Sequence, residues 1–544
     1  MKVKALSRSQ ASTTRSTIHD LRITHKNLDP SSHPQARARE YTRAVTSAKL
    51  DRMFAQPFLG ELQGGHVDAI SCMAIHRSNL CPIVTGCVDG TLRIWDLQTR
   101  KLVMNLEAHS RCVSDVVFGN TTNDGRVYSC GEEGVIKAWS IYPTTTSSNS
   151  NSNSGGFGGM EEEENDGNDR SDDDDDDSDG YGKKPKANKK MTGKKKQSTS
   201  SSSSSDLAAT TSSPYGPHNI YRLPTPRNNN QFNVNNAFHS IDHHWSDSKL
   251  VSASSTAAVH IWDTERTIST PITTFNNLWG SDDTVTTVRY NPAERDLIAH
   301  CSNDRGIGLH DTRSSSALQK TIMAMKCNCL EWNPMEPYMF VVGNEDYNAY
   351  TFDMRKLSRP TGMYKGHVGA VMSVAWSPTG TEFVTGSYDK TIRIFSVRKE
   401  GGTSSHSGYN ATGVARDVYH TKRMQRVFCV GYTLDHKYIL SGSDDTNIRL
   451  WKARSSEKIG QLSAREEASL QYRNALVQKY VHLPEVKRIA KGRRVPKFVK
   501  KETAQAMVQK EKRMRKESNV INHSKPGTKK FTDEKAKAIV KTVD

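Results

Sequence analysis

Short apolar runs separated by tight-turn residues make up much of the chain, and residues 366–395 show this pattern most clearly. Residues 371–376 form an apolar run that Ser373 interrupts, and 383–386 and 392–395 are two further runs with apolar character. Turn-forming residues, among them Gly380, separate the three runs. The pattern predicts three short antiparallel strands. Such a unit cannot bury both of its faces alone, so neighbouring copies of it are expected.

A spacing of six residues identifies the copies. It separates an acidic residue in a turn from an aromatic residue or histidine at the end of the third predicted strand. The pairs are Asp89 and Trp95, Glu133 and Trp139, Asp304 and His310, Asp346 and Phe352, Asp389 and Phe395, and Asp445 and Trp451. Thr256 and Trp262 keep the spacing without the acid. The dipeptides Gly65-His66, Ala108-His109, Gly366-His367 and Tyr419-His420 lie about 30 residues upstream, as in WD40 repeats. Seven copies predict an all-β fold, a seven-bladed WD40 β-propeller.

Each predicted blade offers side chains for a buried hydrogen-bonded set, because a buried His or Asp is stable only with a partner. Blade 1 offers His66, Thr85, Asp89 and Trp95, and blade 7 offers His420, Ser441, Asp445 and Trp451. Blades 3, 4 and 5 lack one or more members. The residue types match a hydrolase triad, but the repetition favours a structural role. The expected structural residues are His66, Asp89, Trp95, His109, Trp139, Trp262, His367, Asp389, His420, Asp445 and Trp451.

No enzyme motif occurs in a strand-turn-helix context: there is no P-loop, dinucleotide-binding glycine pattern, zinc-protease helix or nucleophile elbow. Cys327 and Cys329 form the only close cysteine pair, and no second pair or nearby histidine completes a zinc site. We therefore expect no catalytic residue, metal or cofactor. A propeller channel without perturbed ionisable groups would be the simplest observation against an enzyme.

Composition divides the chain into three regions. An N-terminal arm (1–58) precedes the propeller (59–452), and an extension (453–544) follows it. The arm contains a candidate helix at 39–54, although an arm that orders only on binding is the alternative. Blade 2 contains an insert at about 143–217, rich in Ser, Asn, Asp and Lys, which predicts disorder. Its lysines suggest a nuclear localisation signal, with a solvated loop as the alternative: Lys183, Lys184, Lys186, Lys189, Lys190, Lys194, Lys195 and Lys196.

The extension reads as basic and α-helical. A capping-box pattern at 463–466 begins one helix, Pro484 ends it, a short helical turn follows, and a longer helix is expected at 498–520. From Lys452 onward there are 25 lysines and arginines against 10 acidic residues, which accounts for most of the net charge of +17. The chain before this extension has nearly equal numbers of positive and negative charges, whereas the extension is strongly basic. This distribution suggests a nucleic-acid partner, with solvated charge as the alternative. The candidate RNA contacts are Lys487, Arg488, Lys491, Arg493, Arg494, Lys497, Lys500 and Lys501. Phe498 is the only aromatic residue near them in sequence, which favours phosphate neutralisation over base stacking.

Nine scattered cysteines form no disulfide framework, which indicates a reducing compartment. The first residues lack the apolar core of a secretory signal, and no apolar run is long enough for a membrane helix. These features predict an intracellular protein with no membrane partner.

Several runs outside the repeat motif are specific enough to indicate a family. They are MKVK (1–4), DP (29–30), HP (33–34), REY (39–41), AQPF (55–58), IDHHW (241–245), WNPME (332–336), NEDYN (344–348), YHTKRMQ (419–425) and HSKPG (523–527). With these runs the chain resembles the nucleolar suppressor-of-fibrillarin WD-repeat family. The resemblance covers nearly the whole chain except about 143–217.

The resemblance implies a non-enzymatic scaffold in the nucleus and nucleolus, within the small-subunit processome. Its implied partners are processome proteins, the box C/D small nucleolar ribonucleoprotein (snoRNP) and pre-rRNA, and its implied process is small ribosomal subunit biogenesis. Animal members of the family are also described as substrate receptors of a cullin-RING ubiquitin ligase. That role implies adaptor docking through an Asp-x-Arg motif after a blade's third strand, present here as Asp311/Arg313 and Asp353/Arg355. The alternative is that these residues only stabilise their own turns.

Overall fold

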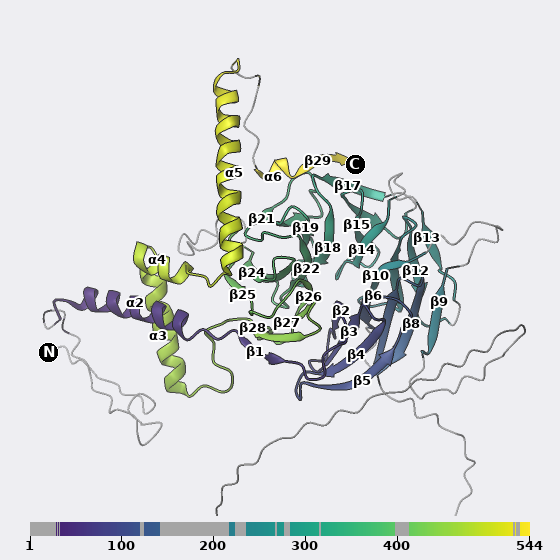
Figure 1. Cartoon of the computed structure of the whole chain (residues 1–544), viewed down its shortest axis with the longest axis horizontal. Coiled ribbons are helices and arrows are strands. Elements are labelled where there is room, and N and C mark those ends of the chain that lie inside the picture. Colours follow the sequence, from purple (N-terminus) through teal and green to yellow (C-terminus); the bar gives the residue numbers. More distant parts are fainter. Residues whose placement is uncertain are drawn as a thin grey trace, which may run out of the picture. The chain divides into compact units, whose positions relative to one another are not determined.

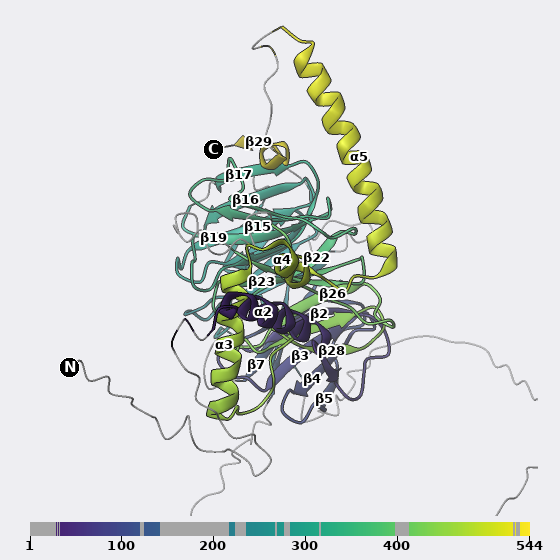
Figure 2. The same ribbon diagram turned by 90° about the vertical axis from the view of Figure 1, so that its left-hand side faces the viewer.

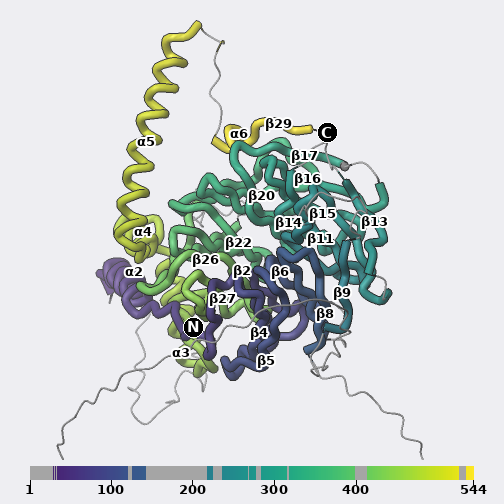
Figure 3. Tube along the Cα trace, turned by 45° about the vertical axis from the view of Figure 1, so that its right-hand side comes forward, coloured from purple at the N-terminus to yellow at the C-terminus, as the bar shows by residue number. Residues whose placement is uncertain are grey.

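The computed structural model confirms the seven-bladed propeller (Figure 1). It describes residues 29, 31, 33–119, 125–141, 217–223, 236–266, 269–276, 283–314, 317–397, 413–525, 528 and 534–543. Seven antiparallel sheets make up the ring, and residues of their first strands line a central channel. Figure 3 shows the Cα trace of the same part of the chain. The predicted insert at about 143–217 lies almost entirely outside the described residues, and so do its eight candidate localisation lysines.

Each blade begins with the strand at the channel and continues outward. Blade 1 consists of β2 (Ile70–Ile75), β3 (Pro82–Cys87), β4 (Thr91–Asp96) and β5 (Lys101–Glu107). Blade 2 consists of β6 (Val113–Phe118), β7 (Arg126–Gly131), β8 (Val135–Ser140) and β9 (Asn219–Arg222). Blade 3 consists of β10 (Phe238–His243), β11 (Lys249–Ser254), β12 (Val259–Asp263) and β13 (Thr273–Phe275). The insert therefore separates the third and fourth strands of blade 2.

The remaining four blades repeat this order. Blade 4 consists of β14 (Val285–Tyr290), β15 (Leu297–Ser302), β16 (Gly306–Asp311) and β17 (Ala317–Met323). Blade 5 consists of β18 (Cys327–Trp332), β19 (Met339–Asn344), β20 (Ala349–Asp353) and β21 (Gly362–Tyr364). Blade 6 consists of β22 (Val371–Trp376), β23 (Glu382–Ser387), β24 (Ile392–Ser396) and β25 (Asp417–Tyr419). Blade 7 contains β26 (Val427–Tyr432), β27 (Tyr438–Ser443) and β28 (Ile448–Lys452).

A strand from the N-terminal part of the chain completes blade 7. This strand, β1 (Phe58–Glu61), pairs antiparallel with β28, and Phe58 lies opposite Trp451. The first strand of the propeller therefore becomes the outer strand of its last blade, and this pairing joins the two ends of the ring.

Apolar side chains from neighbouring blades pack against each other and form the core. In one such cluster Val84 and Ile94 of blade 1 meet Val116 and Val127 of blade 2. Trp95, Trp262 and Trp451 are fully buried. Because each blade buries its faces against the next, the propeller is stabilised as one continuous ring.

Helices from both ends of the chain pack together beside the propeller (Figure 2). The arm forms α2 (Ala36–Met53), and the extension forms α3 (Ala464–Tyr480), α4 (Pro484–Lys491), α5 (Lys497–Asn522) and α6 (Glu534–Lys537). The capping box predicted at the start of α3 is present, because the Ser463 side chain and the Glu466 backbone are hydrogen-bonded and the reciprocal bond also forms. None of the described helices is long and apolar enough to span a membrane.

The extension differs from the sequence expectation at its end. Residues Ile539–Val543 form a strand, β29, which pairs with β17 and becomes a fifth strand on blade 4. Three of its five residues, Ile539, Val540 and Val543, are β-branched and apolar, which favours an extended conformation.

Candidate functional site

The expected buried hydrogen-bonded sets are most complete in blades 2 and 6. In blade 6, His367 Nδ1 lies 2.9 Å from Asp389 Oδ2, and His367 Nε2 lies 2.6 Å from Thr385 Oγ1. Burial alone would raise the pKa of Asp389, but hydrogen bonds from His367 and Thr391 and the nearby charge of Arg393 outweigh it and lower that pKa to about 2. Burial lowers the pKa of His367, so its imidazole is neutral near pH 7.

Blade 2 repeats this arrangement with a glutamate in place of the aspartate. His109 Nδ1 lies 2.7 Å from Glu133 Oε1, and His109 Nε2 lies 2.8 Å from Ser129 Oγ. The Trp139 indole N–H donates to the same Ser129 hydroxyl at 3.0 Å. Burial would raise the pKa of Glu133, but hydrogen bonds from Ser110 and Lys137 outweigh it and lower that pKa to about 2.

Blade 1 forms only part of the expected set. Thr85 Oγ1 lies 2.7 Å from His66 Nε2 and accepts from the Trp95 indole at 2.8 Å. Asp89 instead accepts from the backbone and hydroxyl of Thr91, within its own turn. In blade 3 the Trp262 indole donates to Ser252 at 2.8 Å, without an acid.

In blade 7 the expected set is not formed around His420. The Trp451 indole donates to Ser441 at 2.9 Å, as expected, but Asp445 accepts from the guanidinium of Arg449. Arg449 is fully buried, so a cation of the same blade takes the role that the sequence suggested for His420. His420 instead lines a cavity beside the C-terminal extension.

The hydroxyl groups in these sets cannot meet a substrate, because Ser129, Thr385 and Ser441 have no exposed surface. Their geometry resembles that of a triad, yet each hydroxyl is held by an indole, an imidazole or both. In the part of the chain that the structure describes, no cluster of three or more His, Cys, Asp or Glu is arranged to hold a metal ion.

The central channel contains ionisable groups, contrary to the simplest expectation for a scaffold. Arg77 Nη2 lies 2.8 Å from Asp242 Oδ1, and Arg289 Nη1 lies 3.0 Å from Asp115 Oδ2. Burial raises the pKa of Glu331 to about 8. Each ion pair joins residues of different blades, so the pairs link blades across the channel of about 620 Å³. The channel alone therefore does not decide against an enzyme.

Two arginines on blades 4 and 5 are held in the same geometry at the protein surface. Arg313 donates to Asp311 through Nε at 3.1 Å and Nη2 at 2.9 Å. Arg355 donates to Asp353 in the same bidentate way, at 3.0 Å for both bonds. The two arginine side chains remain 73% and 65% exposed. Both line one cavity of about 620 Å³, so neighbouring blades present a matched pair of rigid cations.

The tail's basic surface is built on contacts between the two ends of the chain. The Tyr41 hydroxyl of α2 donates to Glu485 of α4 at 2.6 Å. Glu40 of α2 accepts from Lys479 at 2.7 Å and Tyr480 at 2.9 Å, both in α3. These bonds explain why the arm is helical here: α2 has helical partners for its buried residues.

Seven of the eight candidate RNA contacts are exposed, and Arg493 is half-buried. They lie on α4, on the segment between α4 and α5, and on the first turns of α5. Val486 and Val499 are buried and anchor the two helices on which the cations stand. We define Lys487, Arg488, Lys491, Arg493, Arg494, Lys497, Lys500 and Lys501 as the tail's basic surface.

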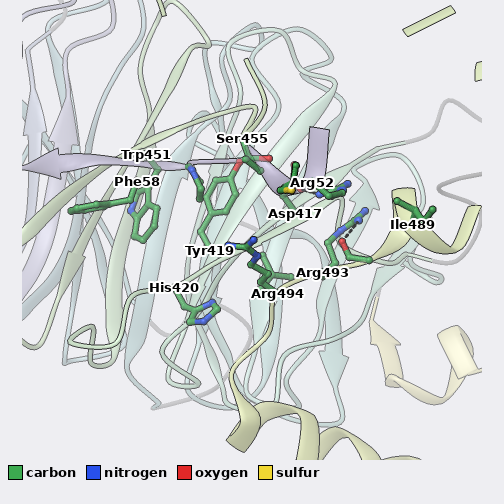
Figure 4. Close-up of a pocket in the computed structure, with 15 residues that line it drawn as sticks. Arg52, Phe58, Asp417, Tyr419, His420, Trp451, Ser455, Ile489, Arg493 and Arg494 are labelled. Atoms are coloured by element: carbon green, nitrogen blue, oxygen red, sulfur yellow. Dashed lines mark hydrogen bonds and ion pairs between the residues drawn. The ribbon is translucent and has the colours of Figure 1, made fainter. Parts of the chain in front are cut away.

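A cavity of about 680 Å³ lies where this surface meets the propeller (Figure 4). We call it the seam cavity. Its lining comes from the end of α2 and β1, from β25 of blade 6, from blade 7, and from residues 489–494. Figure 4 shows the labelled side chains, which include Arg52, Phe58, Tyr419, His420 and Arg494, around this space. Arg52, Phe58 and Tyr419 were not among the candidate site residues predicted from the sequence. Arg52 and Phe58 are more than 400 residues from the basic tail, and Tyr419 lies in a different repeat unit, so no local pattern joins them to it.

Comparisons with known proteins cover the whole chain. The Sof1-like domain model matches residues 453–539, and the model of the WD domain, G-beta repeat, matches 58–96, 358–396 and 418–452. "DDB1- and CUL4-associated factor 13" of Danio rerio is 38% identical, with all of both chains covered, and its Homo sapiens counterpart is 36% identical with the same coverage. "Protein SOF1" of Saccharomyces cerevisiae is 34% identical over 95% of this chain and 90% of that protein.

Proposed function

Because the chain belongs to the suppressor-of-fibrillarin family of WD-repeat proteins, we propose that it is a non-enzymatic scaffold in small ribosomal subunit biogenesis. It acts in pre-rRNA processing within the small-subunit processome. The propeller binds processome proteins and snoRNP, and the tail's basic surface contacts pre-rRNA or the RNA of the box C/D particle. Linkage of several weak contacts on one rigid ring raises the effective concentration of each partner for the others.

The observation that carries this proposal is the position of the tail's basic surface. Its cations stand on α4, on α5 and on the segment between them, and seven of the eight are exposed. The arm helix α2 is bonded to α4, and its Arg52 joins the Ala490 carbonyl of α4 to Asp417 of blade 6. Exposed cations on a rigid frame neutralise phosphates and release counterions, which makes RNA binding strongly dependent on salt. A flexible tail of the same composition would have to be ordered on binding.

The test compares two triple variants of the full-length chain. K487Q/R488Q/K491Q removes three cations of α4, and K101Q/K356Q/K437Q removes three exposed lysines of the propeller as a matched control. We expect only the α4 variant to lose affinity for structured pre-rRNA fragments, with its salt slope reduced by about two to three, as expected for three lost phosphate contacts. An unchanged affinity and slope for the α4 variant would contradict the RNA-binding role of this surface.

We also propose a nuclear and nucleolar location, in agreement with this function. The eight lysines at 183–196 supply the import signal. A fluorescently tagged chain with these lysines replaced by glutamine should accumulate outside the nucleus, whereas the K101Q/K356Q/K437Q control should not. Nuclear accumulation of both variants would assign import to another segment or to a partner.

A second candidate function is that of a cullin-RING ligase substrate receptor. Two observations favour it: the relatives named "DDB1- and CUL4-associated factor 13", and the exposed, bidentately held Arg313 and Arg355 on adjacent blades. The variant R313Q/R355Q should lose co-purification with the ligase adaptor and keep association with pre-ribosomes. Arg266, which is 65% exposed and pairs with Asp263 after the third strand of blade 3, supplies the control variant R266Q. Retained adaptor binding in R313Q/R355Q would contradict this function.

A further inference from the structure

Three segments that are distant in sequence form the seam cavity. Residues 52–58 contribute Arg52 and Phe58, residues 417–420 contribute Tyr419 and His420, and residues 489–494 contribute Arg494. The cavity volume of about 680 Å³ lies within the ~300–1,000 Å³ that is typical of small-ligand sites. The cavity is continuous with the tail's basic surface, because Arg493 and Arg494 belong to both.

The charged groups of the seam cavity differ in how they are held. Arg52 is paired with Asp417 at 3.1 Å and donates to the Ala490 carbonyl at 2.7 Å. Arg493 also donates to the Ala490 carbonyl, at 2.7 Å. Among the described residues, no hydrogen bond or ion pair engages the exposed guanidinium of Arg494. Arg494 is therefore the cation that is available to an anionic ligand.

Asp417 is the one acidic residue of the lining, and its charge is already compensated. It accepts from Arg52 at 3.1 Å on one oxygen and from Arg416 at 3.1 Å on the other. Three arginines against one doubly paired aspartate leave the lining cationic. The cavity therefore favours a ligand with negative charge.

The remaining lining is aromatic and apolar, which distinguishes the cavity from a simple anion site. Phe58 packs edge-on against the buried Trp451, with ring centroids 5.4 Å apart, and remains 40% exposed. Trp451 thus fixes a ring that presents part of its surface to the cavity. His420 contributes an imidazole whose pKa is lowered by burial, so it is neutral near pH 7 and able both to donate and to accept a hydrogen bond.

From this arrangement we propose that the seam cavity binds one unstacked nucleotide of single-stranded RNA, with its base against Phe58 and its phosphate at Arg494. The proposal rests on the RNA-binding function proposed above and specifies where a single-stranded segment is held. Aromatic stacking combined with cationic phosphate contacts is the usual mode of single-strand recognition. An acidic peptide would use the arginines but would leave the exposed ring without a matching partner.

The test uses the full-length chain, a short fluorescein-labelled oligouridylate and an RNA hairpin of the same length. F58L keeps an apolar side chain but removes the ring, and R494Q removes the available cation. K500Q, on an exposed lysine of α5 outside the cavity, is the matched control. Anisotropy titrations should show oligouridylate binding weakened about fivefold or more in F58L, the lower end for loss of one stacked base, with hairpin binding unchanged.

R494Q should weaken oligouridylate binding by a similar factor, whereas K500Q should reduce the affinities for the two RNAs equally. Photo-crosslinking of oligouridylate that contains 4-thiouridine should yield adducts in the peptides around Phe58 or Tyr419. Because Phe58 lies in β1, thermal unfolding of F58L is measured in parallel, and the crosslink in the unmodified chain provides a readout that does not depend on any variant.

Two results would overturn the proposal. In one, F58L and R494Q bind oligouridylate as the unmodified chain does, and no crosslink maps to the cavity. In the other, a polyglutamate peptide binds the chain and R494Q abolishes that binding, while oligouridylate does not compete; the cavity is then an acidic-peptide site. If F58L and R494Q have no effect while K487Q/R488Q/K491Q still loses hairpin binding, only the seam-cavity proposal is wrong and the broader RNA-binding function stands. If none of the three variants affects RNA binding, both proposals are wrong.

Discussion

Blade 6 and blades 4 and 5 use carboxylates in turns for opposite purposes. In blade 6 the Asp389 carboxylate is buried and held by His367, and no part of the pair is available to a partner. In blades 4 and 5 the Asp311 and Asp353 carboxylates hold arginines that are 73% and 65% exposed. Burial therefore separates the two cases more clearly than residue type does.

The physical reason is the difference in solvation. A buried carboxylate that loses its partner remains as an uncompensated charge in a low-dielectric interior, so the pair is essential to the fold. An exposed pair contributes little to stability because water and salt screen it, but the carboxylate fixes the orientation of the guanidinium. The following predictions test this contrast, in order of decreasing effect on stability.

The largest expected effect is that of D389A in blade 6. Removal of the carboxylate leaves His367 and the hydroxyl of Thr391 without their partner in the core. We expect the free energy of unfolding to fall by about 3–5 kcal/mol, because at least two hydrogen bonds to a charged group are lost at about 1.5–3 kcal/mol each. Urea unfolding followed by circular dichroism measures this, with D353N, in the surface pair of blade 5, as the control. A similar loss of stability in both variants would contradict the contrast.

The next effect concerns pH. Burial lowers the pKa of His260 to about 4, from an ordinary value of 6.5. The unfolded chain therefore takes up this proton near pH 6.5 and the folded chain only near pH 4, so the free energy of unfolding falls as the pH drops through this window. Once the pH is below both pKa values, this one histidine has lowered the free energy of unfolding by roughly 3 kcal/mol. H260Q should flatten this part of the profile, whereas H523Q, at the exposed end of α5, should not.

A smaller effect is expected for S129A in blade 2. The Ser129 hydroxyl is the common partner of His109 and of the Trp139 indole. Its removal leaves two buried polar groups without a partner, which costs about 1–3 kcal/mol. Chemical unfolding should show this decrease, and S518A, on the exposed surface of α5, should leave the midpoint unchanged. A neutral S129A would show that the hydrogen bonds of blade 2 are dispensable.

The smallest effect on stability is expected for R313Q/R355Q. Both side chains are largely exposed and form ion pairs with carboxylates of their own turns or of the adjacent loop, and Arg355 also lies over the Tyr338 ring at 4.5 Å. The unfolding midpoint should therefore equal that of the unmodified chain, even where adaptor binding is lost. A clear shift of the unfolding midpoint would indicate that both arginines stabilise their own turns instead.

The sequence predicts the local part of this molecule well. The spacing between Asp389 and Phe395 reflects one strand and one turn, so it is visible in any single blade. The partner His367 lies 22 residues upstream, within the same repeat. Substitution within a repeat is harder to foresee: Arg449 replaces His420 as the partner of Asp445 because a long cation on the neighbouring strand reaches the same carboxylate.

Contacts between distant segments could not be predicted from periodicity. The pairing of β29 with β17 depends on a free sheet edge, which no local pattern encodes. The same holds for the seam cavity, whose aromatic side chains lie far from the basic residues in sequence. Only the fold reveals that Phe58 and Arg494 line one space, because no periodicity or spacing in the sequence relates the two residues.

The pairing of β1 with β28 also has a consequence for biosynthesis. Phe58 is translated long before Trp451, its partner in the completed sheet. While the ribosome makes the six intervening blades, β1 has no strand to join and the first blade has no neighbour on one side. Closure must therefore follow synthesis of the seventh blade, and the waiting edges are prone to mispairing until then. A nascent chain halted before residue 448 should consequently bind chaperones that a released chain does not.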